Sequence, residues 1–120
     1  MKRSYLITKV ESPDRSWIEE VLAAAVDCFP WGGAGGRSDF RPLTTARMAV
    51  SPEEDALLVY MESDEWNPGS MERGYSGQVY TDSCMELFLM PDPERSSLYF
   101  NWEFNPSGAM YLTLGTHRYD

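Results

Sequence analysis

Alternation of apolar and polar residues is clearest in the second half of the chain, where it predicts β-strands. In the segment 98–105 every second residue is large and apolar. Successive side chains of a strand point to opposite faces, so this segment predicts one apolar face and one polar face. The polar face would carry Tyr99, Asn101, Glu103 and Asn105.

The segment 82–90 is predicted to be the antiparallel partner of this strand, joined to it through the turn residues 91–97. A slip of one residue exchanges the two faces of a strand, so burial selects the register in which both apolar sets lie together. That register places Glu86 beside Asn101 or Glu103. The sequence therefore predicts a polar surface that carries two carboxylates and two amides.

Further strands are predicted at 5–10, 45–50, 56–62 and 109–114, and the second and third of these form a hairpin around the polar turn 51–55. Between residues 16 and 27, apolar residues recur at helical spacing and alanines raise the helix propensity, which predicts one helix. A short helix followed by a strand through Phe29 is the alternative. The pattern as a whole indicates a mainly β chain, an antiparallel β-sandwich with at most one short helix.

Length and charge limit the classes of partner. The 120 residues suffice for one domain with one core. Ten Lys and Arg against nineteen Asp and Glu give a net charge of -9, which repels nucleic acids and anionic membrane surfaces. The N-terminus has no apolar core of the kind that a secretion signal needs, so we expect a soluble, cytoplasmic protein. Cys28 and Cys84 are expected to be buried thiols, with a single disulfide left open.

The polar face has a chemistry that matches a sugar. An Asn side chain both donates and accepts hydrogen bonds and a carboxylate accepts them, as vicinal hydroxyls require. Aromatic rings in or beside the loops could pack on the C–H face of a pyranose ring. The candidates are Trp31, Trp66, Tyr75 and Tyr80. A plain solvent-facing side of the sheet would give the same alternation, and this interpretation stays open.

Two runs carry a resemblance to a known family. Residues 79–93 read Val-Tyr-Thr-Asp-Ser-Cys-Met-Glu-Leu-Phe-Leu-Met-Pro-Asp-Pro, and residues 99–108 read Tyr-Phe-Asn-Trp-Glu-Phe-Asn-Pro-Ser-Gly. Both resemble the family 9-like carbohydrate-binding modules, whose fold is a DOMON-like β-sandwich. The resemblance implies non-catalytic binding of an oligosaccharide or polysaccharide. Its implied site residues are Tyr80 as an aromatic platform, Glu86 as the hydroxyl acceptor, and Glu103 and Asn105 as a polar pair, with Asn101 as an alternative member.

The resemblance also bears on domain organisation. Domains of this family run past the length of this chain, so residues 1–120 are expected to form one partial domain whose C-terminal strands are missing. In related proteins a glycoside hydrolase domain is attached.

Four other functions stay open. A β-sandwich can be a structural or interaction domain without a ligand, and Glu86 with Glu103 could form the carboxylate pair of a glycoside hydrolase. A haem module would use His117 with Met85 or Met110. No cofactor is expected, although Ca²⁺ suits the oxygen-rich loop residues Asp82, Asp92 and Glu94.

Overall fold

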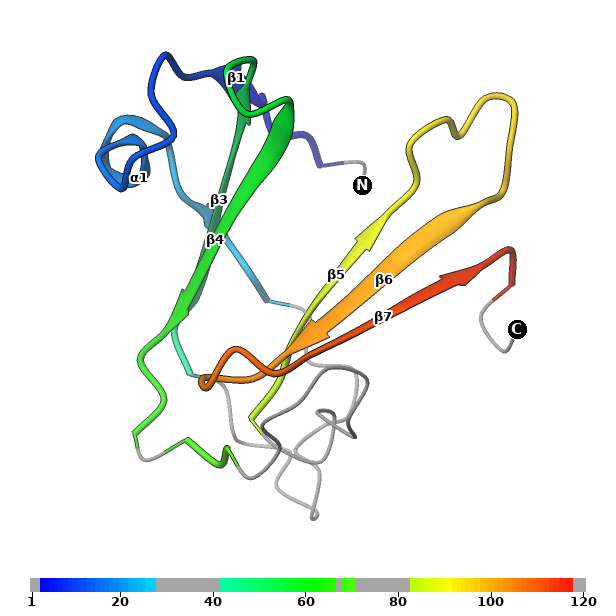
Figure 1. Cartoon of the computed structure of the whole chain (residues 1–120). Helices are drawn as coiled ribbons and strands as arrows, with labels where there is room; N and C mark the ends of the chain where they lie inside the picture. Colours follow the sequence, from blue (N-terminus) through cyan, green and yellow to red (C-terminus); the bar gives the residue numbers. More distant parts are fainter. Residues whose placement is uncertain (1–2, 28–41, 67, 71–82, 118–120) are drawn as a thin grey trace. The chain divides into compact units, whose positions relative to one another are not determined.

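The computed structural model describes residues 3–27, 42–66, 68–70 and 83–117. The chain forms two compact units, residues 1–65 and 66–120, and each unit contains one sheet (Figure 1). The mainly β, two-sheet class predicted for a β-sandwich is confirmed. No helix among these described residues is long and apolar enough to cross a membrane.

A long hairpin is the framework of the first unit. Strand β3 (Thr44–Ser51) pairs with β4 (Ala56–Ser63) along its whole length, from Thr44 opposite Ser63 to Ser51 opposite Ala56. In the turn, Ser51 Oγ accepts a hydrogen bond from the Glu54 amide at 3.2 Å, and Asp55 adopts a positive φ of 50°. Asp tolerates this left-handed conformation, so the polar turn at 51–55 does what its sequence predicts.

Two short strands complete the first sheet. Strand β1 (Thr8–Lys9) runs parallel to β3, and β2 (Ala24–Ala25) runs antiparallel to it, so the sheet is mixed rather than wholly antiparallel. The strand predicted at 5–10 is therefore shorter than expected. Ahead of β1, the Tyr5 hydroxyl donates to the Leu22 carbonyl at 2.6 Å and accepts from the Met48 amide at 3.2 Å. This side chain uses a β3 amide that a longer β1 ladder would need.

The single helix predicted for 16–27 is wrong. Helix α1 spans only Trp17–Glu20, and Val21 already has extended backbone angles of φ -105° and ψ 133°. A helix this short gains few hydrogen bonds for the residues it orders. Residues 24–25 instead bond to β3, which satisfies their backbone groups in a sheet. The alternative of a short helix followed by a strand fits these residues, while Phe29 lies outside the described ones.

The core of the first unit lies between α1 and the sheet. Its buried members are Val10, Trp17, Val21 and Ala49, and Tyr5, Ile18, Leu58 and Tyr60 pack around them partly buried. Ala49 is fully buried at 0% exposure. The small residue on β3 leaves room for the large indole ring of the core.

The second unit is a three-stranded antiparallel sheet in the order β5 (Met85–Leu89), β6 (Tyr99–Phe104), β7 (Met110–Gly115). All three strands lie within or overlap the predicted segments, so the predicted meander is confirmed.

Replacing Trp17 with alanine should destabilise the chain by about 3–5 kcal/mol, the usual cost of emptying a buried aromatic site. Urea unfolding followed by circular dichroism measures this loss. Leu22 is the matched control, since its side chain is 83% exposed and Leu22→Ala should change stability by less than about 0.5 kcal/mol. Equal losses from the two variants would contradict the core assignment.

Candidate functional site

The register of β5 and β6 brings the predicted carboxylates directly together. Glu86 lies opposite Glu103, and Phe88 lies opposite Asn101. On the other side of β6, Tyr111 lies opposite Glu103 and Thr113 opposite Asn101. Opposed residues of antiparallel strands share a face, so these side chains form one surface. We call this surface the polar face.

The reverse face of the same sheet is wholly apolar. It carries Met85, Leu87 and Leu89 from β5, Phe100, Trp102 and Phe104 from β6, and Met110, Leu112 and Leu114 from β7. The rings of Phe100 and Trp102 stack with centroids 5.5 Å apart and planes inclined by 28°. The separation of polar and apolar side chains that alternation predicts is confirmed. The predicted register of β5 and β6, which places Glu86 beside Glu103, is confirmed as well.

The carboxylates of the polar face are partly withdrawn from water. Burial raises the pKa of Glu86 above its ordinary value, and the charge of Glu103 raises it further. Burial also raises the pKa of Glu103. Two like charges on directly opposed strand positions repel one another, so the face favours a shared proton or a ligand that donates hydrogen bonds.

Two polar atoms of this face are buried with no hydrogen-bond partner in the described part of the chain. They are Nδ2 of Asn101, a donor, and Oε2 of Glu103, an acceptor. Asn101 itself is only 6% exposed. Leaving such atoms unpaired costs about 1–3 kcal/mol each, and native proteins rarely keep them without a reason.

Asn105 has a different task at the end of β6. Its Oδ1 accepts hydrogen bonds from the amides of Ser107 and Ala109, both at 3.0 Å. The Gly108 amide donates to the Asn105 carbonyl at 3.0 Å, and Gly108 has the positive φ of 84° that the turn needs. The side-chain oxygen of Asn105 is therefore engaged in closing the β6–β7 hairpin, and a sugar contact by this residue stays a prediction.

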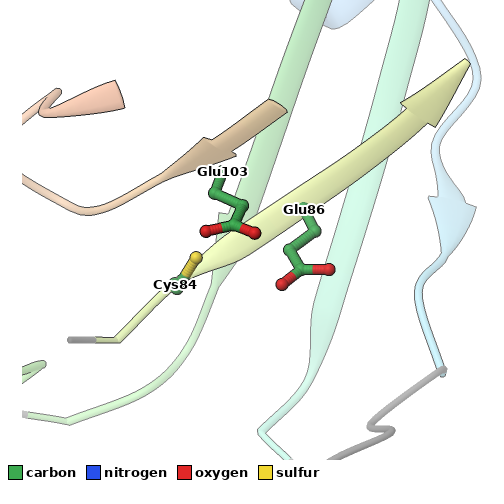
Figure 2. Close-up of side chains that lie close together, drawn as sticks. All are labelled: Cys84, Glu86 and Glu103. Carbon is green, nitrogen blue, oxygen red and sulfur yellow. The ribbon is translucent and has the colours of Figure 1, made fainter. Parts of the chain in front are cut away.

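A thiol lies beside the two carboxylates. Cys84 Sγ and one carboxylate oxygen each of Glu86 and Glu103 all lie within 4.8 Å of one another (Figure 2). The Cys84 thiol also contacts the Met85 carbonyl at 3.5 Å. These three ligand atoms could hold a metal ion, and the sulfur would favour zinc over calcium.

The residues considered for calcium are placed differently. Asp92 forms an ion pair with Arg95 at 3.7 Å, and Glu94 is exposed. Neither belongs to the group of three possible metal ligands found within the described residues, and Asp82 lies outside them.

The residues considered for haem are also separated. Met85 and Met110 both lie opposite Phe104 on the apolar face, whereas His117 follows the far end of β7. The strand from Met110 to Gly115 is roughly 17 Å long at about 3.3 Å per residue. The strand therefore holds the methionines and the histidine at opposite ends.

Sequence and fold comparisons agree with this geometry. The family model for carbohydrate-binding family 9 matches residues 15–120. The chain belongs to carbohydrate-binding family 9. The fold is similar to that of a candidate carbohydrate-binding protein from Bacteroides uniformis ATCC 8492, whose crystal structure was solved at 2.70 Å, with a TM-score of 0.71 at 20% identity. No curated protein matches the chain.

The match to that structure covers 93% of this chain and 52% of the other, so this chain spans about half the length of that protein. At this identity the likeness concerns the fold alone. As a member of family 9, the chain is assigned to the carbohydrate-binding modules. Tyr80, Trp31 and Tyr75, three of the aromatic candidates, lie outside the described residues, and Trp66 is exposed on the segment after β4.

Sequence reasoning missed the contribution of β7 to the polar face and the contact between the two aromatic residues on it. Tyr111 and Thr113 flank the β6 polar residues, and Phe88 and Tyr99 contact one another with ring centroids 5.9 Å apart. Extending the predicted register by one strand would have found Tyr111 and Thr113. The Phe88–Tyr99 contact depends on side-chain directions that alternation alone does not fix.

Glu86→Gln should raise the Tm at pH 7, because the substitution removes a carboxylate whose ionised form is disfavoured in the folded chain. With a folded pKa above the unfolded one, the folded state binds more protons between the two values, so stability from this group falls as pH rises. The gain should shrink steadily toward pH 4, as the pH falls through the raised folded pKa toward the ordinary Glu pKa of about 4.3. Thermal unfolding between pH 4 and 7 measures this, with exposed Glu94→Gln as the control. A difference that does not change with pH would refute the assignment.

Asn105→Ala should destabilise the chain by about 1–3 kcal/mol, because two turn amides lose their shared acceptor. Ser97→Ala is the control before the other end of β6, since Ser97 is exposed and losing its hydroxyl should change the free energy of unfolding by less than about 0.5 kcal/mol. Urea unfolding compares the two variants, and indistinguishable midpoints would show that the Asn105 side chain does not hold the turn.

Proposed function

We propose that the polar face binds a neutral saccharide without chemically altering it, with Glu86, Asn101 and Glu103 as its hydrogen-bonding residues. The observation that carries this proposal is the pair of unpartnered atoms on neighbouring residues, the Asn101 donor and the Glu103 acceptor. A sugar hydroxyl can donate and accept at once, so adjacent hydroxyls of one ring would satisfy both atoms once the Asn101 and Glu103 side chains turn toward the ligand. Membership of carbohydrate-binding family 9 supports the same class of ligand.

Electrostatics favours a neutral ligand. The chain has a net charge of -9, and the face presents two opposed carboxylates. An anionic sugar would be repelled, whereas hydroxyl donors relieve the repulsion of the carboxylates by hydrogen bonding to their charged oxygens. Burial raises the pKa of both Glu86 and Glu103, and the charge of Glu103 adds to the rise at Glu86, so a donor to these carboxylates would favour their ionised forms.

The remaining parts of the expected site complete this proposal. Tyr80 would pack one ring on the apolar side of the sugar, as the resemblance implies, and Asn105 would support the β6 end of the face. The ligand would be an oligosaccharide or polysaccharide, and the chain would act as a soluble, cytoplasmic module, with an attached hydrolase domain where a longer protein supplies one.

The two opposed carboxylates favour hydrolysis as the second candidate function. Raised pKa values are a property of the general acid in glycosidases. One oxygen of each carboxylate lies within 4.8 Å of the other, closer than the roughly 5–5.5 Å that retaining enzymes leave between carboxyl groups for the scissile bond. Assays for released reducing sugar with the purified chain distinguish the two functions, and we expect no release.

Isothermal titration calorimetry with a panel of neutral oligosaccharides should show binding by the wild-type chain, weakened by about tenfold or more in Glu86→Gln. A hydrogen bond to a charged group contributes about 1.5–3 kcal/mol, which corresponds to that factor. The control variant is Glu94→Gln, which removes an exposed carboxylate from the 91–97 loop and should leave the affinity unchanged. Because Glu86→Gln is expected to stabilise the fold at pH 7, loss of binding cannot be ascribed to unfolding. Equal affinities for wild type and Glu86→Gln would overturn the proposed site.

A further inference from the structure

Phe88 is an exposed aromatic residue in the middle of a strand. It lies on the polar face, two residues after Glu86 and directly opposite Asn101, and 60% of its surface is exposed. The neighbouring apolar positions of β5, Leu87 and Leu89, are partly buried on the reverse face. Because most of the Phe88 ring is exposed, its burial contributes little to the stability of the fold. The ring is therefore accessible to a ligand.

Tyr99 holds a second ring beside it. The Phe88 and Tyr99 centroids are 5.9 Å apart with the planes inclined by 47°. The Tyr99 hydroxyl donates to the His117 carbonyl at 2.8 Å, so the far end of this ring is fixed. Residue 115, opposite Tyr99 on β7, is glycine, and a Cβ there would lie 3.0 Å from the Tyr99 hydroxyl oxygen. The glycine lets the ring lie close against β7.

These contacts make a fixed pair of rings rather than two independent side chains. Tyr99 is held by its hydrogen bond and by the close approach to Gly115, and Phe88 rests against Tyr99. A surface that is ordered before binding loses less conformational entropy when a ligand packs on it. We call Phe88 and Tyr99 the aromatic pair.

We propose that the aromatic pair is a second sugar subsite, which packs against the C–H face of the residue that follows the one held by Glu86 and Glu103. This inference rests on the proposed function. One step of two residues along β5, roughly 6.6 Å, separates Glu86 from Phe88, so both fall under one extended ligand. Asn101 lies between Glu103 and Tyr99 on β6, and its unpaired Nδ2 would donate to the sugar once the side chain turns toward the ligand.

The neighbours of the aromatic pair favour a saccharide over other occupants. A wholly apolar partner covering Phe88 would offer no donor or acceptor to the Asn101 and Glu103 atoms that are already buried and unpaired, so their cost of about 1–3 kcal/mol each would persist. A nucleic acid would meet the net charge of -9. A pyranose ring offers an apolar C–H face to the rings and hydroxyl groups at its edge to the polar atoms.

The test compares sugars of different length by titration calorimetry. The probes are the mono-, di- and tetrasaccharides of the β-1,4-linked glucose, xylose and mannose series, with the wild-type chain, Phe88→Ala, Phe88→Trp and Leu114→Ala. We expect Phe88→Ala to weaken binding of the longer sugars by about three- to tenfold, the contribution of one aromatic contact, and to leave the monosaccharide unchanged. Phe88→Trp should retain the affinity, because it keeps a ring.

Leu114→Ala is the matched control, since Leu114 is 58% exposed on the apolar face of the same sheet and should not affect any probe. If the wild type binds, Glu86→Gln weakens binding and Phe88→Ala does not, the second subsite is wrong while the proposed function stands. If Phe88→Ala weakens the monosaccharide equally, the ring belongs to the first subsite and the extension is overturned. If no sugar binds to the wild type, both proposals fail.

Discussion

Two carboxylates held directly opposite one another on neighbouring strands set the character of the second sheet. Nothing in their own interaction favours this arrangement, since like charges on opposed strand positions repel and partial burial disfavours their ionised forms. The arrangement persists because the reverse face fixes the register. A slip of one residue would move the stacked Phe100 and Trp102 rings to the polar face and the carboxylate of Glu103 to the apolar face. The register that gathers the apolar side chains on one face therefore imposes an unfavourable polar contact on the other.

Most of the second unit could be predicted from sequence because its strands are local and strictly alternating. The first unit shows where local patterns fail. The helical spacing between residues 16 and 27 is real, but the alanines at 24–25 gain more from pairing with β3, a strand some 20 residues later in the chain, than from extending a one-turn helix. Likewise the parallel pairing of β1 with β3 joins distant segments. Long-range pairing of this kind leaves no mark in the spacing of nearby residues.

The sequence predicts which residues of the candidate site share one face of the sheet. It predicts less well what each of these residues does. Glu86, Asn101 and Glu103 share a surface because strand alternation and register determine it. Asn105 obeys the same alternation, yet its oxygen closes the hairpin, because residue 105 falls where β6 ends and the turn amides need an acceptor. The ring of Tyr99 lies against Gly115. This contact can be predicted from the sequence only if the register between β6 and β7 is known.

As proposed, the polar face would combine two kinds of recognition that differ in which sugars they can distinguish. A ligand that lacks the matching hydroxyl leaves the buried donor and acceptor atoms of the protein unpaired, so it binds more weakly. The Glu86 and Glu103 end of the face would therefore distinguish sugars by the configuration of their hydroxyl groups. Aromatic rings accept any flat apolar face and discriminate little, so the Phe88 end would add affinity and tolerate variation in the following residue. In the proposed site, binding would relieve the cost of the unpaired atoms of Asn101 and Glu103, so the proposed function explains why a fold would keep them.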